Sequence, residues 1–151
     1  MKFRKFNLLC LFVLVLASAC SPNIENLASE GDLEGLIGAF KHGEVREEAV
    51  LALVDVGEPA IQPLITALDD EKPEIREYAA KTLGMIGDTA AVDPLIKVLD
   101  DEVDSVKFEA IRSLGMIKDP KAIQPIINEL SHIDPRQVYA LELTASALVK
   151  I

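Results

Sequence analysis

The sequence predicts an all-α protein, a right-handed α-solenoid of about four helical hairpins. The first observation is a repeat: PLIKVL at residues 94–99 returns 31 residues earlier as PLITAL (63–68) and 31 residues later as PIINEL (125–130). The second is that each period holds two segments with apolar residues at helical spacing, separated by Gly, Pro and Asp. Periods of this length built from two helices are typical of solenoids.

The units follow from the matched segments. Units two, three and four are expected at residues 58–86, 88–117 and 119–151, and the second helices of units two and three carry matching patterns at 75–87 and 106–118. A divergent unit one has four apolar residues at helical spacing between positions 33 and 40, with Asp32 as the predicted N-cap. Its second helix is expected at residues 44–56, and Gly57 ends it.

Three prolines recur at the same place in the first helices, namely Pro63, Pro94 and Pro125. A proline beyond the first helical residue removes a hydrogen-bond donor and crowds the preceding turn. We therefore expect a bend near the start of each first helix, with the same geometry in every unit.

Residues 1–19 have the pattern of a secretory signal. Lys2, Arg4 and Lys5 form a basic start, an apolar run follows at residues 8–16, and small residues precede Cys20. The nine apolar residues are too few to cross a bilayer, which takes about twenty. We expect the protein to be exported and residues 1–19 to be removed.

Residues 16–20, LASAC, resemble the bacterial lipoprotein box, in which the cysteine becomes the lipidated first residue of the mature protein. The resemblance implies that Cys20 carries acyl chains and that residues 20–26 form a tether to a bacterial cell membrane or outer membrane. Cleavage by an ordinary signal peptidase is the alternative. It would leave Cys20 as a free or intermolecularly paired thiol.

The net charge argues against one class of partner. The chain carries 15 basic and 25 acidic residues, a net charge of −10; without residues 1–19 the balance is 12 against 25, or −13. Nucleic-acid binding requires a basic surface that neutralises phosphates. Nucleic acid is therefore not an expected partner.

A second resemblance covers residues 27–151. Unit two places Asp70 in the turn, Arg76 on the second helix, and then an alanine and a Leu-Gly pair; unit three repeats this order with Asp101 and Lys107. The order resembles the HEAT-like repeat of the phycobilisome-lyase type, which implies a solenoid whose second helices line a concave face. We expect the turn carboxylates to cap the next helix and to pair with basic side chains across stacked units.

No catalytic residue, cofactor or metal is expected. His42 and His132 each follow a first helix, and neither has a second ligand at metal spacing. The acidic runs at residues 69–71 and 100–102 are expected to be solvated turns, because a calcium loop needs more oxygen ligands at regular spacing. The chain also lacks a recognisable nucleophile–base set, so the protein is not expected to be an enzyme.

Candidate binding residues lie on the side of the second helices that faces away from the apolar stripe. At 100° per residue, Glu77, Lys81 and Gly84 point outward and form a ridge along the helix. The predicted protein-binding residues of this ridge are Lys81, Phe108, Arg112 and Tyr139. Two aromatic rings beside a guanidinium are typical of an interaction hot spot. The alternative is that both rings fold onto neighbouring helices.

The last predicted helix, residues 138–151, is apolar apart from one narrow polar stripe. A terminal unit of a solenoid normally presents a polar outer face. Leu143, Ala147 and Ile151 are therefore candidates for contact with a partner or for a homodimer through the C-terminal helix.

Together these patterns favour a non-enzymatic, membrane-tethered scaffold or adaptor that binds another protein of the bacterial cell envelope. A bilin-lyase-like or other enzyme-accessory role is the first alternative, because the repeat type resembles subunits of enzymes that attach bilins. A purely structural spacer is the second alternative. It predicts that charge reversal on the ridge has no effect.

Overall fold

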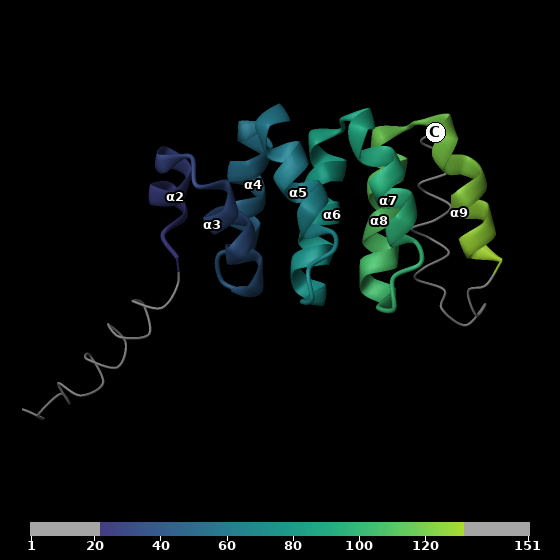
Figure 1. Ribbon diagram of the computed structural model, residues 1–151, viewed down its shortest axis with the longest axis horizontal. Helices are drawn as coiled ribbons and strands as arrows, with labels where there is room; N and C mark the ends of the chain where they lie inside the picture. The colour runs from purple at the N-terminus through teal and green to yellow at the C-terminus, as the bar shows by residue number, and fades with distance from the viewer. Residues whose placement is uncertain (1–21, 132–151) are drawn as a thin grey trace, which may run out of the picture.

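The computed structural model describes residues 22–131, which form helices and no strand. The helices stand side by side in an elongated row of pairs, from α2 at one end to α9 at the other (Figure 1). This arrangement confirms the predicted all-α solenoid. In chain order the elements are α2 (Ile24–Glu30), α3 (Leu33–Gly38), the 3₁₀ turn η1 (Ala39–Lys41), α4 (Arg46–Val56), η2 (Glu58–Ala60), α5 (Ile61–Ala67), α6 (Pro73–Ile86), η3 (Thr89–Ala91), α7 (Val92–Val98), α8 (Asp104–Ile117), η4 (Pro120–Ala122) and α9 (Ile123–Leu130).

The hairpins match the predicted units. Unit one pairs α3 with α4, unit two pairs α5 with α6, and unit three pairs α7 with α8, while α9 is the first helix of unit four. The second helices are neighbours in space, since α6 packs between α4 and α8. The predicted second helix of unit four lies outside the described residues.

The same register positions are buried in successive units, which makes one core along the array. In the first helices these are Leu64, Leu95 and Ile126, and in the second helices Ala49, Ala79, Ala110, Leu53, Leu83 and Leu114, all at 0% exposure. Each unit therefore contributes equivalent side chains to a core that crosses the unit boundaries. Such a core depends on its neighbours, as expected for a stacked array.

The prolines fall where the backbone changes helix type. Pro63, Pro94 and Pro125 are each the third residue of an α-helix that follows a 3₁₀ turn. The turn before the first of them closes with a hydrogen bond from Ala60 N to Gly57 O of 2.9 Å. Because a proline nitrogen carries no donor, an irregular helix start accommodates it. The change from a 3₁₀ turn to an α-helix thus recurs in the same register in all three units, and the predicted bend stays a prediction.

Helices α6 and α8 each end at a residue in the left-handed helical conformation. Gly87 has φ 79° at the end of α6, and Lys118 has φ 63° at the equivalent end of α8. Both backbone N–H groups donate to the carbonyl of a buried leucine one turn earlier. A lysine in this conformation costs roughly 1 kcal/mol relative to glycine. The conformation that ends the second helix is therefore the same in units two and three despite that cost.

The N-terminal boundary differs from the prediction. Helix α2 begins at Ile24, within the residues expected to be a tether, and the Ile24 side chain is buried at 4% exposure. Asn23 caps this helix, because its side-chain oxygen accepts a hydrogen bond from Asn26 N at 3.1 Å. The helical chain therefore starts three residues before position 27. The predicted cap at Asp32 is confirmed by its hydrogen bond from Gly35 N at 2.9 Å.

Within residues 22–131, no single helix has both the length and the apolar composition to cross a membrane. One pair of segments in this range, α4 and Glu58–Ala67, is long and apolar enough when the two are taken together, but a bend of 118° separates them.

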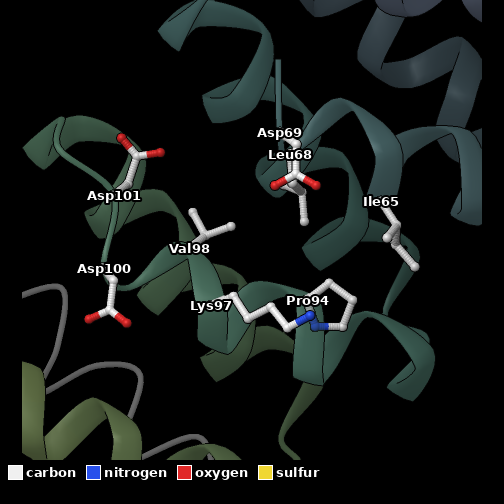
Figure 2. Close-up of a pocket in the computed structure, with 8 residues that line it drawn as sticks. All are labelled: Ile65, Leu68, Asp69, Pro94, Lys97, Val98, Asp100 and Asp101. Carbon is white, nitrogen blue, oxygen red and sulfur yellow. The ribbon is translucent and has the colours of Figure 1, made fainter. Parts of the chain in front are cut away.

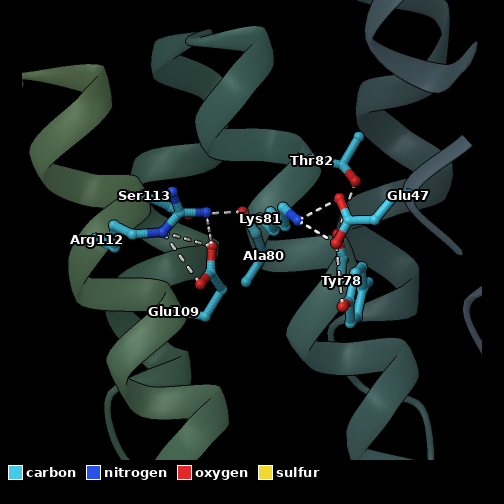
Figure 3. Close-up of polar contacts among 8 residues, drawn as sticks. All are labelled: Glu47, Tyr78, Ala80, Lys81, Thr82, Glu109, Arg112 and Ser113. Carbon is cyan, nitrogen blue, oxygen red and sulfur yellow. Dashed lines mark hydrogen bonds and ion pairs between the residues drawn. The ribbon is translucent and has the colours of Figure 1, made fainter. Parts of the chain in front are cut away.

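Gly84 was expected to point outward, and this prediction is wrong. The residue is buried where α6 meets α8, and a Cβ at this position would lie 2.5 Å from the Cβ of Ser113. The Ser113 hydroxyl donates to the carbonyl oxygen of Ala80 at 2.8 Å across the same contact (Figure 3). The prediction assumed that α6 buries one apolar stripe. In the structure α6 packs on its own first helix, α5, and also on the neighbouring second helices α4 and α8, so a wider part of its surface is buried.

Candidate functional site

The second helices α4, α6 and α8 present equivalent outward positions next to one another (Figure 3). In each helix these positions lie two and one residues before the buried alanine and two residues after it. We refer to them as the second-helix ridge. It consists of Glu47, Glu48 and Leu51 on α4, Glu77, Tyr78 and Lys81 on α6, and Phe108, Glu109 and Arg112 on α8.

Both predicted binding cations are paired within the ridge. Lys81 Nζ donates to the two carboxylate oxygens of Glu47 at 2.6 Å each, which joins α6 to α4. Arg112 Nε donates to the carboxylate of Glu109, one turn earlier on α8, at 3.0 and 3.1 Å. A partner that uses either cation has to share or displace these carboxylates.

Tyr78 is a ridge residue that the sequence analysis missed. Its hydroxyl donates to Glu47 at 3.2 Å, and its ring lies 4.8 Å from the guanidinium carbon of Arg46 and 5.0 Å from the Lys81 ammonium. The ring also packs at 5.8 Å from Phe40. Cations within about 6 Å of an aromatic ring are attracted to its face. The available signal was an aromatic residue one position after Glu77, in the place that Glu109 takes in unit three.

The charge state of Glu47 reflects these contacts. The hydrogen bond from Lys81 is the largest cause that lowers the pKa of Glu47 below its usual range, against a smaller opposing effect of burial. The hydrogen bond from Tyr78 and the positive charge of Arg112 lower it further. Glu47 is therefore an ionised acceptor whose contacts with Lys81 and Tyr78 connect units one and two.

The other predicted binding residues differ in how much the structure says of them. Phe108 is partly buried and packs against the core, which agrees with the alternative that its ring folds onto neighbouring helices. Tyr139, Leu143 and Ile151 lie outside the described residues, as does Cys20. The predicted adjacency of the two aromatic rings stays a prediction.

The repeated acidic and basic residues form a link between units two and three. Arg76 donates Nε and Nη2 to the two oxygens of Asp101 at 2.7 and 2.8 Å, and Nη1 to the carbonyl oxygen of Asp70 at 2.8 Å. Asp101 also accepts from Val103 N at 2.9 Å, next to the start of α8. The expected pair across units is thus confirmed for Asp101. The expected helix cap is wrong, because Asp101 accepts from the residue that precedes α8 and the first turn of α8 has no side-chain cap. Arg76 is 8% exposed, so this pair serves the fold and leaves little for a ligand.

In unit three, the equivalent basic residue makes a weaker link. Lys107 Nζ donates to Glu129 on α9 at 3.4 Å. An ammonium group lacks the planar fork that lets a guanidinium hold both oxygens of one carboxylate. The chain has His132 where a third turn aspartate would stand, so the lysine reaches an acceptor on the first helix instead.

The first helices carry shallow grooves on the opposite side of each hairpin. The groove between α5 and α7 has an apolar floor that includes Leu68 and Val98, with Asp69 and Asp100 at its rim (Figure 2). Similar hollows lie between α3 and α5 and between α7 and α9. Because the grooves repeat with the units, they reflect the spacing of the first helices and not a specialised site. Across residues 22–131, no three His, Cys, Asp or Glu side chains converge on a possible metal position.

Family comparison agrees with this architecture. The family model described as HEAT repeats matches residues 61–143, which is more than half of the 151-residue chain. The chain belongs to the HEAT repeat family. A model described as the PBS lyase HEAT-like repeat also matches this HEAT repeat protein, at residues 45–70. A search of curated protein sequences found no match. HEAT repeats suggest a protein-interaction scaffold, since stacked hairpins display an extended surface.

Proposed function

We propose that this HEAT repeat protein is a non-enzymatic, membrane-tethered adaptor that binds another protein of the bacterial cell envelope through its second-helix ridge. The observation that carries the proposal is the side-by-side placement of α4, α6 and α8, which makes their outward residues one surface across three units. Tethering near a bilayer raises the effective concentration of partners held at the same membrane. A stiff array of this kind then acts by holding one protein next to another.

The ridge has the composition of a surface that recognises a protein. It combines aromatic rings at Tyr78 and Phe108 with a guanidinium at Arg112, residue types that are enriched at interface hot spots. The Glu47–Lys81 pair fixes two of its long side chains in advance. Side chains that are already ordered lose less entropy on binding.

The tether rests on Cys20, and its lipidation is directly testable. In a bacterial host fed an alkyne analogue of palmitate, we expect the parent chain to be labelled and to partition into a detergent phase. The Cys20→Ser variant should be unlabelled and should partition into the aqueous phase, because one modified thiol carries the anchor. An unlabelled parent with a free thiol would instead indicate ordinary signal-peptidase cleavage.

Binding through the ridge is tested by reversing its two cations. We expect Lys81→Glu/Arg112→Glu to lose at least about tenfold of the partner recovered by crosslinking and co-purification from the native envelope. The reversals break the Lys81–Glu47 and Arg112–Glu109 pairs and place like charges side by side, so the ridge side chains are no longer ordered before binding. Phe108→Ala is avoided because this ring packs against the core.

The matched control for that experiment is Lys41→Glu/Lys97→Glu, which reverses two exposed lysines on the first-helix side. Recovery should stay within about twofold of the parent, since exposed charges away from an interface contribute little. Equal loss in both double variants would point to net charge alone. Full recovery with both would favour the structural spacer, or a partner site on the C-terminal residues 138–151.

The match to the PBS lyase HEAT-like repeat favours one alternative, a bilin-handling role. Purified protein mixed with a free bilin should then show a shifted visible absorption band that survives gel filtration. An unchanged spectrum, with all bilin eluting separately, would leave the adaptor as the preferred function.

A further inference from the structure

One ridge position breaks the pattern of its neighbours. Lys81 on α6 and Arg112 on α8 lie two residues after the buried alanine of their helices, and on α4 the same position is Leu51. The Leu51 side chain is 57% exposed, more than the exposed isoleucines of α9, Ile123 at 36% and Ile127 at 43%. The ridge therefore begins in unit one with an apolar side chain instead of a cation.

Carboxylates surround this leucine. Glu47, Glu48 and Asp55 stand four residues before, three residues before and four residues after Leu51 on α4, and these spacings put them on the same helix face. Glu47 is held by Lys81 and Tyr78. Glu48 and Asp55 are exposed, and among residues 22–131 their side chains have no hydrogen-bond or ion-pair partner.

We infer that the outer face of α4 docks a basic, amphipathic segment of a partner protein. An apolar side chain of the segment covers Leu51, and flanking lysine or arginine side chains pair with Glu48 and Asp55. This inference rests on the proposed adaptor function and names the chemistry of its partner. The inferred contact lies on unit one, beside the residues on α6 and α8 that the sequence analysis predicted to bind a protein.

Charge complementarity selects this occupant. The two carboxylates without partners flank Leu51, and the nearest ridge cation, Lys81, is already neutralised by Glu47. A cationic segment gains from both carboxylates, whereas an acidic segment is repelled. The net charge of −10 likewise disfavours nucleic acid and the anionic surface of a bilayer. An exposed leucine adds an apolar contact that a simple polycation does not use.

The test uses the full-length chain and three fluorescent helical peptides of fourteen residues. The first carries leucine on one face and lysine on the other, the second replaces every lysine with glutamate, and the third replaces every leucine with serine. In fluorescence anisotropy the first peptide should bind at least roughly tenfold more tightly than either of the others, because it alone offers both features. Its affinity should fall as salt is raised.

Variants then locate the contact. Glu48→Lys/Asp55→Lys should weaken the first peptide roughly tenfold, and Leu51→Ser roughly fivefold, since these changes remove the charges and the apolar anchor separately. The matched controls are Asp69→Lys/Asp100→Lys, a double reversal of exposed acids on the first-helix side, and Ile127→Ser, which removes an exposed apolar side chain from α9. Both controls should stay within about twofold of the parent by the same reasoning.

Two outcomes would overturn the inference. If the control reversals weaken the peptide as much as the α4 reversals do, the attraction comes from net charge and not from this face. If no peptide binds, or if the serine peptide binds as well as the leucine peptide, the α4 face is not an amphipathic docking site. Neither result touches the adaptor function itself, which depends on partner recovery from the envelope with the Lys81→Glu/Arg112→Glu variant.

Discussion

Replacing Arg76 with alanine is expected to lower the free energy of unfolding by about 3 kcal/mol, measured by urea or thermal denaturation. The guanidinium is 8% exposed and holds both carboxylate oxygens of Asp101 together with the carbonyl oxygen of Asp70. Its removal leaves the carboxylate of Asp101, whose side chain is only 9% exposed, without its ion-pair partner, which costs more than the net contribution of the intact pair. The units two and three should separate more easily as a result.

Two variants serve as controls for this effect. Arg76→Lys should recover only part of the loss, because an ammonium group cannot donate to both oxygens in a planar fork. Lys81→Ala breaks an ion pair whose acceptor Glu47 is 64% exposed, and it should cost no more than about 1 kcal/mol. A similar loss from Arg76→Ala and Lys81→Ala would contradict a specific role for the buried pair.

The same pair predicts acid sensitivity. The hydrogen bonds from Arg76 are the largest cause that lowers the pKa of Asp101, and the backbone N–H of Val103 lowers it further, against an opposing effect of burial. A carboxyl group with a lowered folded-state pKa stabilises the fold above its unfolded-state value of about 3.9, and this contribution is lost as the pH falls through the folded-state pKa. Stability should therefore fall in acid less steeply for Asp101→Asn than for the parent.

Replacing Gly84 with valine is expected to lower the free energy of unfolding by about 3 kcal/mol, with a matching fall in Tm. A Cβ at this position would lie 2.5 Å from the Cβ and Oγ of Ser113 and 2.7 Å from its Cα. Relief requires α6 and α8 to move apart, and the hydrogen bond from Ser113 to the carbonyl of Ala80 then lengthens. The gain in helix propensity over glycine is below about 1 kcal/mol and does not offset this.

Gly38 provides the matched control, since a Cβ there meets nothing within 4 Å and the backbone is right-handed helical. Gly38→Ala should leave stability unchanged or raise it by about 0.5 to 1 kcal/mol. Adding Ser113→Gly to Gly84→Val should restore part of the lost stability, because it removes the side chain that the new group meets. Additive losses in that double variant would show that the two positions are not in contact.

Much of the fold was predictable because the relevant signals are local and repeated. The period of 31 residues, the recurring prolines and the glycine at the end of unit two placed the hairpins near their observed bounds. The cross-unit pair between Arg76 and Asp101 was also predictable, since its residue types recur in register. The start of α2 was not, because Asn23 and Ile24 sit among polar residues that give little helical periodicity.

The candidate site was predicted only in part. The sequence identified Lys81, Phe108 and Arg112 from their register but did not show that Glu47 and Glu109 already hold the two cations. It also missed Tyr78, whose contacts with Arg46 and Glu47 come from α4, about thirty residues earlier in the chain. The position of a residue in the repeat predicts the helix face on which its side chain lies. It does not predict which side chains of a neighbouring helix contact that face.

By itself the sequence determined the helices, their pairing into units and the repeated core, because apolar spacing and helix-ending residues act within one hairpin. Only the tertiary structure decided which second-helix side chains are free. The offset and separation between neighbouring units bring Gly84 against Ser113 and Lys81 onto Glu47, while Leu51 stays exposed at 57%. These distances depend on how whole units stack. The spacing of residues along one helix does not determine that stacking.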